Sequence, residues 1–316
     1  MERDFGLTVV VGAGALGAMY AERIVASGLD VVFYAEGERK ERIQRNGVVV
    51  NGVSLTLPVV SEVDRWPERI IVALKDQHLR EFLAVLPGIC GPDTTVMSVM
   101  NGIDSEPLLI EALGEAERAD TSRVLYCMVA GMDAVRAGGD VRYTRLGVVS
   151  FGRRRNGPGR AAAGPDRRVE AMGAFLAAAQ IPAESPADME KAIWNKFMLN
   201  VGINQWSAVL GAPYGVFHTV KEARDLMRRA MEEVLEIARS RDIDLTRDDL
   251  ERWFEVVNTL SPEGKTSMLQ DVEAGRKTEV EMFAGRVVAM GREAGVATPV
   301  NAVLFDAIRT LEAMGR

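Results

Sequence analysis

The stretch LTVVVGAGALG, residues 7–17, decides the fold of the first half of the chain. Leu7–Val11 is a short apolar run rich in valine, which predicts a buried parallel strand. The residues that follow fit the spacing G-x-G-x-x-G and lead into a helical pattern. In such a loop Gly12 permits a tight turn, Gly14 lets a phosphate approach the backbone, and Gly17 lets the helix pack on the strand.

The start of this helix is a predicted anion site. The first turn of a helix has N–H groups without partners inside the helix and carries the positive end of the helix dipole. Dinucleotides place their pyrophosphate at such a position, although a glycine turn with a purely structural role is the alternative. We predict that a dinucleotide contacts the loop residues Gly12, Ala13, Gly14, Ala15, Leu16 and Gly17.

Glu36 is a candidate cofactor residue at the end of the second predicted strand, Val31–Ala35. A carboxylate at this place accepts hydrogen bonds from the adenosine ribose hydroxyls and repels a 2′-phosphate, so it favours NAD(H) over NADP(H). The nearby Arg39, Lys40 and Arg42 could instead meet a 2′-phosphate or form the solvated start of a helix.

Outward from this unit, apolar runs alternate with helical patterns. Asn51-Gly52 suits a tight turn and predicts a hairpin within residues 48–60. Strands that alternate with helices predict an α/β fold with a Rossmann-type doubly wound parallel sheet. The further predicted strands are 70–74, 94–100, 123–129 and 147–151, and the helices are 77–86 and 103–113.

Beyond Pro186 the sequence has helical patterns and no convincing strand. Ser261-Pro262 predicts an N-cap followed by proline at the first position of a helix. Apolar residues recur at helical spacing in three longer segments, 221–240, 279–294 and 299–314.

Two domains are therefore predicted, which agrees with the prior for 316 residues. Residues 1–186 form a dinucleotide-binding Rossmann domain, and residues 187–316 form an all-helical domain for substrate binding and catalysis. The apolar helix faces of the second domain could be core or could form a homodimer, and both alternatives stay open. Between the patterned segments, residues 152–168 are rich in Gly, Ala and Arg and predict a mobile, solvated surface loop, with an RNA- or partner-binding arm as the alternative.

Composition narrows the chemistry. The formal net charge of −7 argues against nucleic acid or an anionic membrane surface as a partner. Two cysteines and two histidines are too few for a CxxC-type zinc site or for most histidine chemistry, so we predict no metal. The N-terminus lacks the h-region of a secretory signal, and no stretch is apolar enough to span a bilayer, so we expect a cytoplasmic protein.

The segment WNKFMLNVGIN, residues 194–204, is the most unusual part of the second half. Lys196, Asn200 and Asn204 are spaced i, i+4, i+8 and would share one helix face among apolar neighbours. Because burial of an unpaired amide costs free energy, this spacing predicts a polar pocket, with a polar stripe on a buried helix as the alternative.

Together these motifs resemble the ketopantoate reductase (2-dehydropantoate 2-reductase) family over nearly the whole chain. The resemblance implies nicotinamide-dependent reduction of 2-dehydropantoate to D-pantoate, in pantothenate and coenzyme A biosynthesis. The order and spacing of the motifs are more specific than the glycine loop alone. The motifs are GAGALG at 12–17, Leu74-Lys75, Asn101-Gly102, WNKFMLNVGIN at 194–204, SMLQD at 267–271 and Thr278-Glu279.

The resemblance also implies roles for single residues. Lys196 matches the general acid of the family, and Glu279 matches the glutamate that supports it. Lys75 and Asn101 match positions on the cofactor side. The implied substrate-binding residues are Asn101, Asn200, Asn204 and Ser267. Hydride transfer to a ketone creates alkoxide charge, which an ammonium group can stabilise and protonate, and a neighbouring carboxylate would orient that ammonium.

The chain departs from the family pattern in several places. An arginine for the NADP 2′-phosphate commonly stands where this chain has Glu36, so the resemblance implies NADP(H) while the local residue favours NAD(H). A proline commonly follows the second helix amide, where this chain has Gln205. Residues 126–145 match poorly, and the arginine-rich segment is atypical.

Two other functions stay open. An NAD-dependent D-2-hydroxyacid dehydrogenase of this architecture would act on another branched or aromatic 2-keto acid. A dinucleotide-binding sensor without turnover would not need a proton donor, so the pair of Lys196 and Glu279 argues against it.

Overall fold

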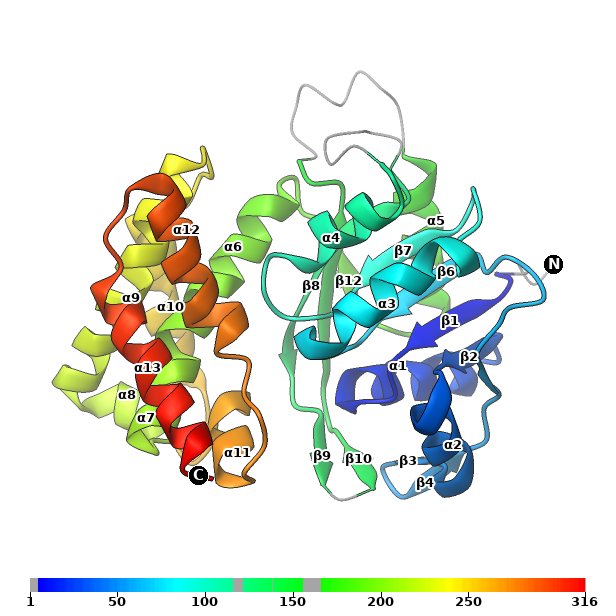
Figure 1. The fold of residues 1–316 in the computed structure, drawn as a ribbon, viewed down its shortest axis with the longest axis horizontal. Coiled ribbons are helices and arrows are strands. Elements are labelled where there is room, and N and C mark those ends of the chain that lie inside the picture. Colours follow the sequence, from blue (N-terminus) through cyan, green and yellow to red (C-terminus); the bar gives the residue numbers. More distant parts are fainter. Residues whose placement is uncertain (1–4, 116–121, 138, 156–165, 316) are drawn as a thin grey trace. The chain divides into compact units, whose positions relative to one another are not determined.

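A computed structural model describes residues 5–115, 122–137, 139–155 and 166–315 of the chain (Figure 1). The chain forms two compact units, Met1–Ala192 and Ile193–Arg316. The division falls inside helix α6 (Met189–Leu199), a few residues after the boundary at residue 186 that the change of pattern predicts.

The first unit is built on an eight-stranded sheet with β1 near its middle. The β1 strand pairs in parallel with β2 on one side and with β6 on the other, and β7 and β8 continue the parallel pairing beyond β6. Among the described pairs of this sheet, only β8–β11 is antiparallel. This sheet confirms the predicted α/β class. In spatial order its strands are β12 (Ala183–Glu184), β11 (Leu146–Gly152), β8 (Val124–Met132), β7 (Thr95–Ser98), β6 (Arg69–Val72), β1 (Thr8–Val11), β2 (Val31–Tyr34) and β5 (Val59–Val60).

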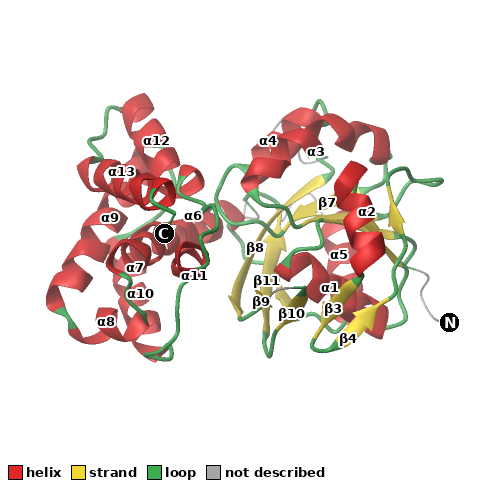
Figure 2. Ribbon diagram, turned by 60° about the horizontal axis from the view of Figure 1, so that its bottom comes forward, coloured by secondary structure: helices red, strands yellow, loops and turns green. Residues whose placement is uncertain are grey.

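Helices cover both faces of this sheet (Figure 2). Helices α1 (Ala15–Ala26) and α5 (Arg167–Ala178) bury Ile24 and Phe175 against one face, in a core shared with strand residues such as Ile71. Helices α3 (Asp76–Ile89) and α4 (Ser105–Ala112) pack on each other and cover the other face. Burial on both faces explains why the strands are continuous apolar runs rather than alternating ones.

A second, four-stranded sheet packs against α1. Its hairpin turns at Asn51 and Gly52, which have positive φ angles of 50° and 81°, so the predicted hairpin is confirmed. The last strand of the predicted segment, β5, instead joins the main sheet beside β2. The other two strands of the small sheet were not predicted. Its order is β4 (Val53–Leu55), β3 (Val48–Val50), β10 (Asp140–Arg142) and β9 (Val135–Ala137).

Ion pairs hold the described ends of the arginine-rich segment, which was predicted to be mobile and solvated. Arg153 is 6% exposed, and its Nε donates to Asp166 Oδ2 at 2.6 Å. Asp166 also caps α5, because its side chain accepts from two backbone N–H groups of the first turn. Arg154 and Arg155 both pair with the buried carboxylate of Glu190. The prediction of a solvated loop is therefore wrong for Arg153 and Arg154, whereas the side chain of Arg155 is exposed. Residues 156–165 lie outside the described part of the chain.

The regular elements described in residues 193–315 are all helices, which confirms the predicted all-helical character of the second unit. Two of its segments are π-helical: one lies between α6 and α7, and the other leads directly into α12. The predicted helix at Ser261-Pro262 is wrong, because the Pro262 carbonyl accepts from Gly215 N at 2.8 Å and the pair forms a turn. The elements after α6 are η2 (Asn200–Asn204), α7 (Gln205–Leu210), α8 (Tyr214–Thr219), α9 (Lys221–Ser240), α10 (Arg247–Thr259), α11 (Ser267–Glu273), η3 (Glu281–Gly285), α12 (Arg286–Ala294) and α13 (Pro299–Ala313). Among the residues that the structure describes, no helix has the length and apolar character needed to cross a membrane.

Two glycines of the loop after β1 are expected to respond differently to alanine. A Cβ on Gly17 would lie 1.9 Å from the Gly12 carbonyl oxygen and 3.1 Å from Ala73 Cβ, so backbone would have to move. Overpacking of this kind costs about 1–3 kcal/mol, more than the 0.5–1 kcal/mol or so that alanine gains over glycine inside a helix. Gly17→Ala should therefore lower the urea midpoint of unfolding.

Gly14→Ala is the matched control for this prediction. The nearest atom to a Cβ on Gly14 is Ala73 O at 4.0 Å, so the substitution should leave the urea midpoint near that of the wild type. Equal midpoints for Gly17→Ala and the wild type would show that the close approach of the helix to the strand is not what requires the glycine.

Candidate active site

The glycine loop leaves room for a ligand at one position. Gly12 has a φ of 104° and no space for a side chain, since a Cβ there would lie 2.5 Å from Ala73 O. Gly14 is the N-cap of α1 and has open space where its side chain would be. Because the first N–H groups of α1 have no partners within the helix, this opening fits a pyrophosphate.

Arg136 is a candidate cofactor residue that the sequence analysis missed. It lies on β9, and its Nη1 donates to Ala13 O in the glycine loop at 2.9 Å. The small sheet is held in place at α1, because the hydroxyl of Tyr143 donates to Glu22 Oε2 at 2.6 Å. Arg136 therefore brings positive charge to the loop from 123 positions away, which no local sequence signal indicates.

Three other predicted residues lie at the same edge of the sheet as the glycine loop. Glu36, Lys75 and Asn101 follow the carboxyl ends of β2, β6 and β7. The last residues of these strands lie side by side, because Val11 of β1 pairs with the ends of β2 and β6, and the end of β6 pairs with that of β7. Glu36 and Lys75 are the exposed N-caps of α2 (Gly37–Asn46) and α3, and Asn101 is half-buried. Ligands of open α/β sheets bind at this edge, so the structure brings these candidates to a common place. Their individual roles stay predictions.

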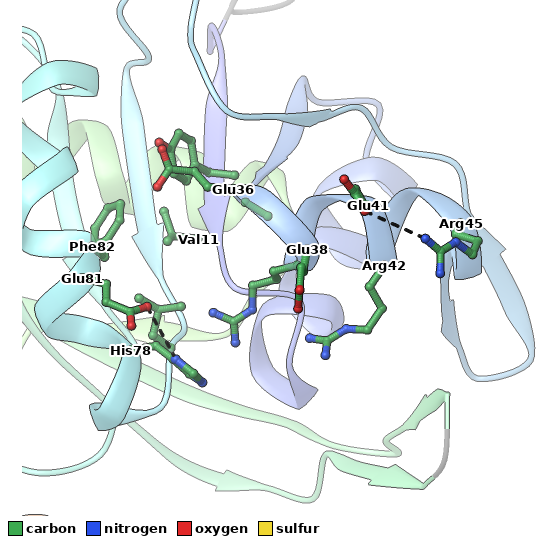
Figure 3. Close-up of a pocket in the computed structure, with 13 residues that line it drawn as sticks. Val11, Glu36, Glu38, Glu41, Arg42, Arg45, His78, Glu81 and Phe82 are labelled. Atoms are coloured by element: carbon green, nitrogen blue, oxygen red, sulfur yellow. Dashed lines mark ion pairs between the residues drawn. The ribbon is translucent and has the colours of Figure 1, made fainter.

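A pocket of about 720 Å³ opens at this edge (Figure 3). Its apolar side includes Val11 and Phe82, and Glu36 lies toward them, whereas Arg42 lies beside Glu38. The size and the mixture of apolar and charged walls suit the adenosine end of a dinucleotide. The charged lining consists of four glutamates and three arginines, namely Glu36, Glu38, Glu41, Glu81, Arg39, Arg42 and Arg45.

Positive charges act on one another at the pocket. Partial burial lowers the pKa of His78, and Arg39, Arg42 and Lys75 lower it further. The pKa of Arg39 is also lowered, by partial burial and by the positive charges of Arg42 and Arg136. The carboxylate of Glu81 opposes this effect at both His78 and Arg39, so the repulsion among the cations is partly offset within the pocket.

In the second unit, Lys196 lies half-buried on α6, and the two amides lie on the π segment that follows. Asn200 is the first residue of η2 and Asn204, 8% exposed, is the last. The predicted helix over 194–204 is therefore α-helical only up to Leu199, and both amides lie in its π segment. Single π turns inside α-helices occur frequently at functional sites.

Ser267 and Glu279 lie on segments that adjoin this helix. Ser267 is exposed and begins α11, and half-buried Glu279 precedes η3, accepting at its carbonyl from Met282 N at 3.1 Å. Both α11 and η3 pack on η2. The ring centroids of Phe197 and Phe283 are 6.2 Å apart, which joins η3 to the turn of α6 that carries Lys196. The elements that carry all five predicted residues are thus packed together in one unit.

Glu106 is a buried acid close in sequence to the predicted Asn101 turn. It is 2% exposed, accepts from Ser105 Oγ at 2.9 Å and accepts from Cys127 N at 3.3 Å. Burial raises the pKa of this carboxyl from 4.5 to about 7, although the two hydrogen bonds oppose the rise.

In the described residues no three His, Cys, Asp or Glu side chains are grouped as metal ligands.

Glu106 should make folding stability depend on pH. A carboxyl whose pKa is higher in the folded than in the unfolded chain stabilises the fold below pH 4.5, and this contribution is lost as pH rises to about 7. The loss amounts to about 3 kcal/mol. We expect Glu106→Gln, which mimics the protonated acid, to remove this loss when urea unfolding is compared at pH 5 and pH 8.

Glu111→Gln provides the control for this measurement, because Glu111 is an exposed residue of the same helix. That variant should retain the pH dependence of the wild type. If Glu106→Gln lost as much stability between pH 5 and pH 8 as the wild type, Glu106 would be charged in the fold at both values.

Both halves of the chain match one protein family. Residues 8–156 match "Ketopantoate reductase PanE/ApbA", and residues 188–312 match "Ketopantoate reductase PanE/ApbA C terminal". A 2-dehydropantoate 2-reductase from Pyrococcus abyssi is 26% identical over 312 residues, which cover 96% of this chain and 97% of that protein.

Two solved structures show the same fold at low identity. A ternary complex of D-mandelate dehydrogenase with NADH and anilino(oxo)acetate has a TM-score of 0.82 at 21% identity and covers 98% of this chain and 99% of its own. A dimeric ketopantoate reductase from Staphylococcus aureus has a TM-score of 0.73 at 18% identity and covers 98% and 100%. With both halves matched in the same order, the chain belongs to the ketopantoate reductase PanE/ApbA family and is an NAD(P)-dependent oxidoreductase of that family.

Proposed function

We propose that this protein reduces 2-dehydropantoate to D-pantoate, a step of pantothenate and coenzyme A biosynthesis. The observation that carries the proposal is the packing of both α11 and η3 on η2, the segment that follows the helix of the half-buried Lys196. This arrangement gathers a cation, amides, a hydroxyl and a carboxylate in one helical unit. The nearly full-length similarity to a 2-dehydropantoate 2-reductase supports the same substrate.

In the proposed reaction, each side chain has a distinct task. A nicotinamide, when bound, supplies the hydride that adds to C2 of the keto acid. Lys196 donates a proton to the developing alkoxide oxygen and stabilises its charge, an effect worth about 10²–10⁴-fold for a positioned acid. Glu279 orients Lys196. Asn200, Asn204 and Ser267 donate hydrogen bonds to the carboxylate and hydroxyl groups of the substrate. Asn101 is likewise a substrate-binding residue in this proposal.

For the cofactor we propose NADH in preference to NADPH. Glu36 follows β2 as the N-cap of α2, where its carboxylate accepts from ribose hydroxyls and repels a 2′-phosphate. The pocket is lined by more carboxylates than guanidinium groups, so it offers no excess positive charge to a phosphate dianion. Arg39 and Arg42 are the residues that would bind NADPH if the preference were reversed.

A second candidate is an NAD-dependent D-2-hydroxyacid dehydrogenase acting on another branched or aromatic 2-keto acid. The observation that favours it is the fold similarity to D-mandelate dehydrogenase, whose complex contains NADH and anilino(oxo)acetate.

By analogy with the dimeric relative we also propose a homodimer, and by analogy with the family a cytoplasmic location.

A steady-state assay of 2-dehydropantoate and a panel of branched and aromatic 2-keto acids, each with NADH and NADPH, tests the proposal. We expect the highest kcat/KM with 2-dehydropantoate and NADH. A higher kcat/KM with an aromatic keto acid would favour the second candidate. A strong preference for NADPH would refute the assignment of Glu36, and no turnover with any keto acid would refute the proposed function.

Lys196→Ala should lower kcat by about 10²-fold or more, because the alkoxide would lose its proton donor. Dinucleotide affinity, measured by quenching of tryptophan fluorescence, should change little, since the glycine loop lies in the other unit. Lys191→Ala removes the same charge from the same helix and should retain nearly full turnover. A kcat for Lys196→Ala close to that of the wild type would exclude Lys196 as the acid.

A further inference from the structure

Gln205 connects the two π segments of the second unit. It is the first residue of α7 and is completely buried. Its Nε2 donates to the Val201 carbonyl in η2 at 2.9 Å, and its Oε1 accepts from Ala284 N in η3 at 2.9 Å. A single side chain therefore bonds to the backbone of both segments.

The irregular backbone explains why a glutamine suits this position. A π turn replaces the i→i+4 hydrogen-bond pattern locally, so some backbone groups next to it need other partners. Those groups are buried, where an unsatisfied donor or acceptor costs free energy. A planar amide offers a donor and an acceptor together, one for the Val201 carbonyl and one for the Ala284 N–H. The proline that is common here in the family has neither group.

The amide of Gln205 is itself held by buried groups. Its Nε2 lies 3.3 Å from Asn301 Oδ1, and Asn301 Nδ2 donates to Glu233 Oε2 at 2.7 Å. The Glu233 carboxylate also accepts from Val300 N at 2.7 Å and Asn301 N at 3.0 Å, in the first turn of α13. Acceptors at a helix N-terminus satisfy N–H groups that have no partner within the helix. The network thus runs from α9 through α13 to both π segments.

From this network we infer that Gln205 is a positioning residue that fixes both π segments. The first segment, η2, carries Asn200 and Asn204, and the second, η3, follows Glu279. The inference rests on the proposed function, in which these residues bind substrate and orient Lys196. Gln205 is not placed to touch substrate, since its amide is engaged with Val201, Ala284 and Asn301. Its effect reaches the reaction through the backbone that it holds.

Positioning predicts a specific pattern of kinetic change. Displacement of reacting groups by about 1 Å can cost 10²-fold in rate. Gln205→Met keeps the length of the side chain but loses both backbone bonds, so we expect kcat/KM for the keto acid to fall about 10²-fold. The dissociation constant of the dinucleotide should stay within about twofold, because its predicted loop belongs to the first unit.

Leu250→Ala is the matched control for a loss of stability alone. Leu250 is a buried residue of α10, outside the Gln205 network. At a temperature where circular dichroism shows both variants folded, Leu250→Ala should retain the kcat/KM of the wild type. Equal losses of kcat/KM in the two variants, or none in Gln205→Met, would overturn the inference.

Hydrogen exchange gives a readout that does not depend on activity. In Gln205→Met we expect faster amide exchange in peptides covering 200–204 and 281–285 than in the wild type, with 247–259 unchanged. If Gln205→Met does not fold, Gln205→Glu keeps an acceptor for Ala284 N–H and should speed exchange at 200–204 more than at 281–285. Unchanged exchange at both segments would overturn the inference. Absence of keto acid reduction by the wild type would instead refute the proposed function and leave the exchange result intact.

Discussion

Close contact between helix α1 and two neighbouring strand ends constrains the first unit. The backbone of Gly17 lies against Gly12, and both glycines lie against Ala73, which follows β6. The helix is thereby fixed to β1 and β6 at once. The strand order reverses between β1 and β6: β2 and β5 lie on one side of β1, and β6, β7 and β8 lie on the other. A helix N-terminus held at that point faces the crevice where doubly wound sheets bind their ligands.

The second unit depends on satisfying buried backbone groups. Two π segments lie against each other in its interior, and each departs from the regular helical ladder. Such departures persist only where other groups supply the missing partners. The completely buried Gln205 is such a group, and Asn301, also completely buried, accepts from its amide. Both are unusual residues for a helical core. Burial of these amides costs free energy, and the irregular helices require it because their buried backbone groups need partners.

Sequence patterns predicted the structure where a local signal has one structural meaning. The run before Gly12 became β1, and Asn51-Gly52 became a hairpin, because strand burial and positive φ angles are local requirements. The cap signal at Ser261-Pro262 was misleading, because these residues form a turn in which the Pro262 carbonyl accepts from the backbone N–H of Gly215 in α8. Arg153 was expected in solvent because composition cannot reveal a distant partner such as Asp166.

The candidate site shows the same limit. Lys196, Asn200 and Asn204 could be chosen as candidates from the sequence, because amides next to a lysine are unusual among apolar residues. Arg136 could not, since only the small sheet brings it to the glycine loop. Gln205 could be noticed only as a departure from the family, because its partners Ala284 and Asn301 are 79 and 96 positions away.

The predicted roles divide between the units according to what each backbone offers. The first unit places the N-caps Gly14, Glu36 and Lys75 of three helices at one edge of its sheet, an arrangement that suits the phosphates and sugars of a dinucleotide. Lys75 is exposed there, and water would screen its charge. Lys196 is half-buried among packed helices, where a cation interacts more strongly with a developing negative charge. The difference in burial between the two lysines explains why proton donation suits the helical unit.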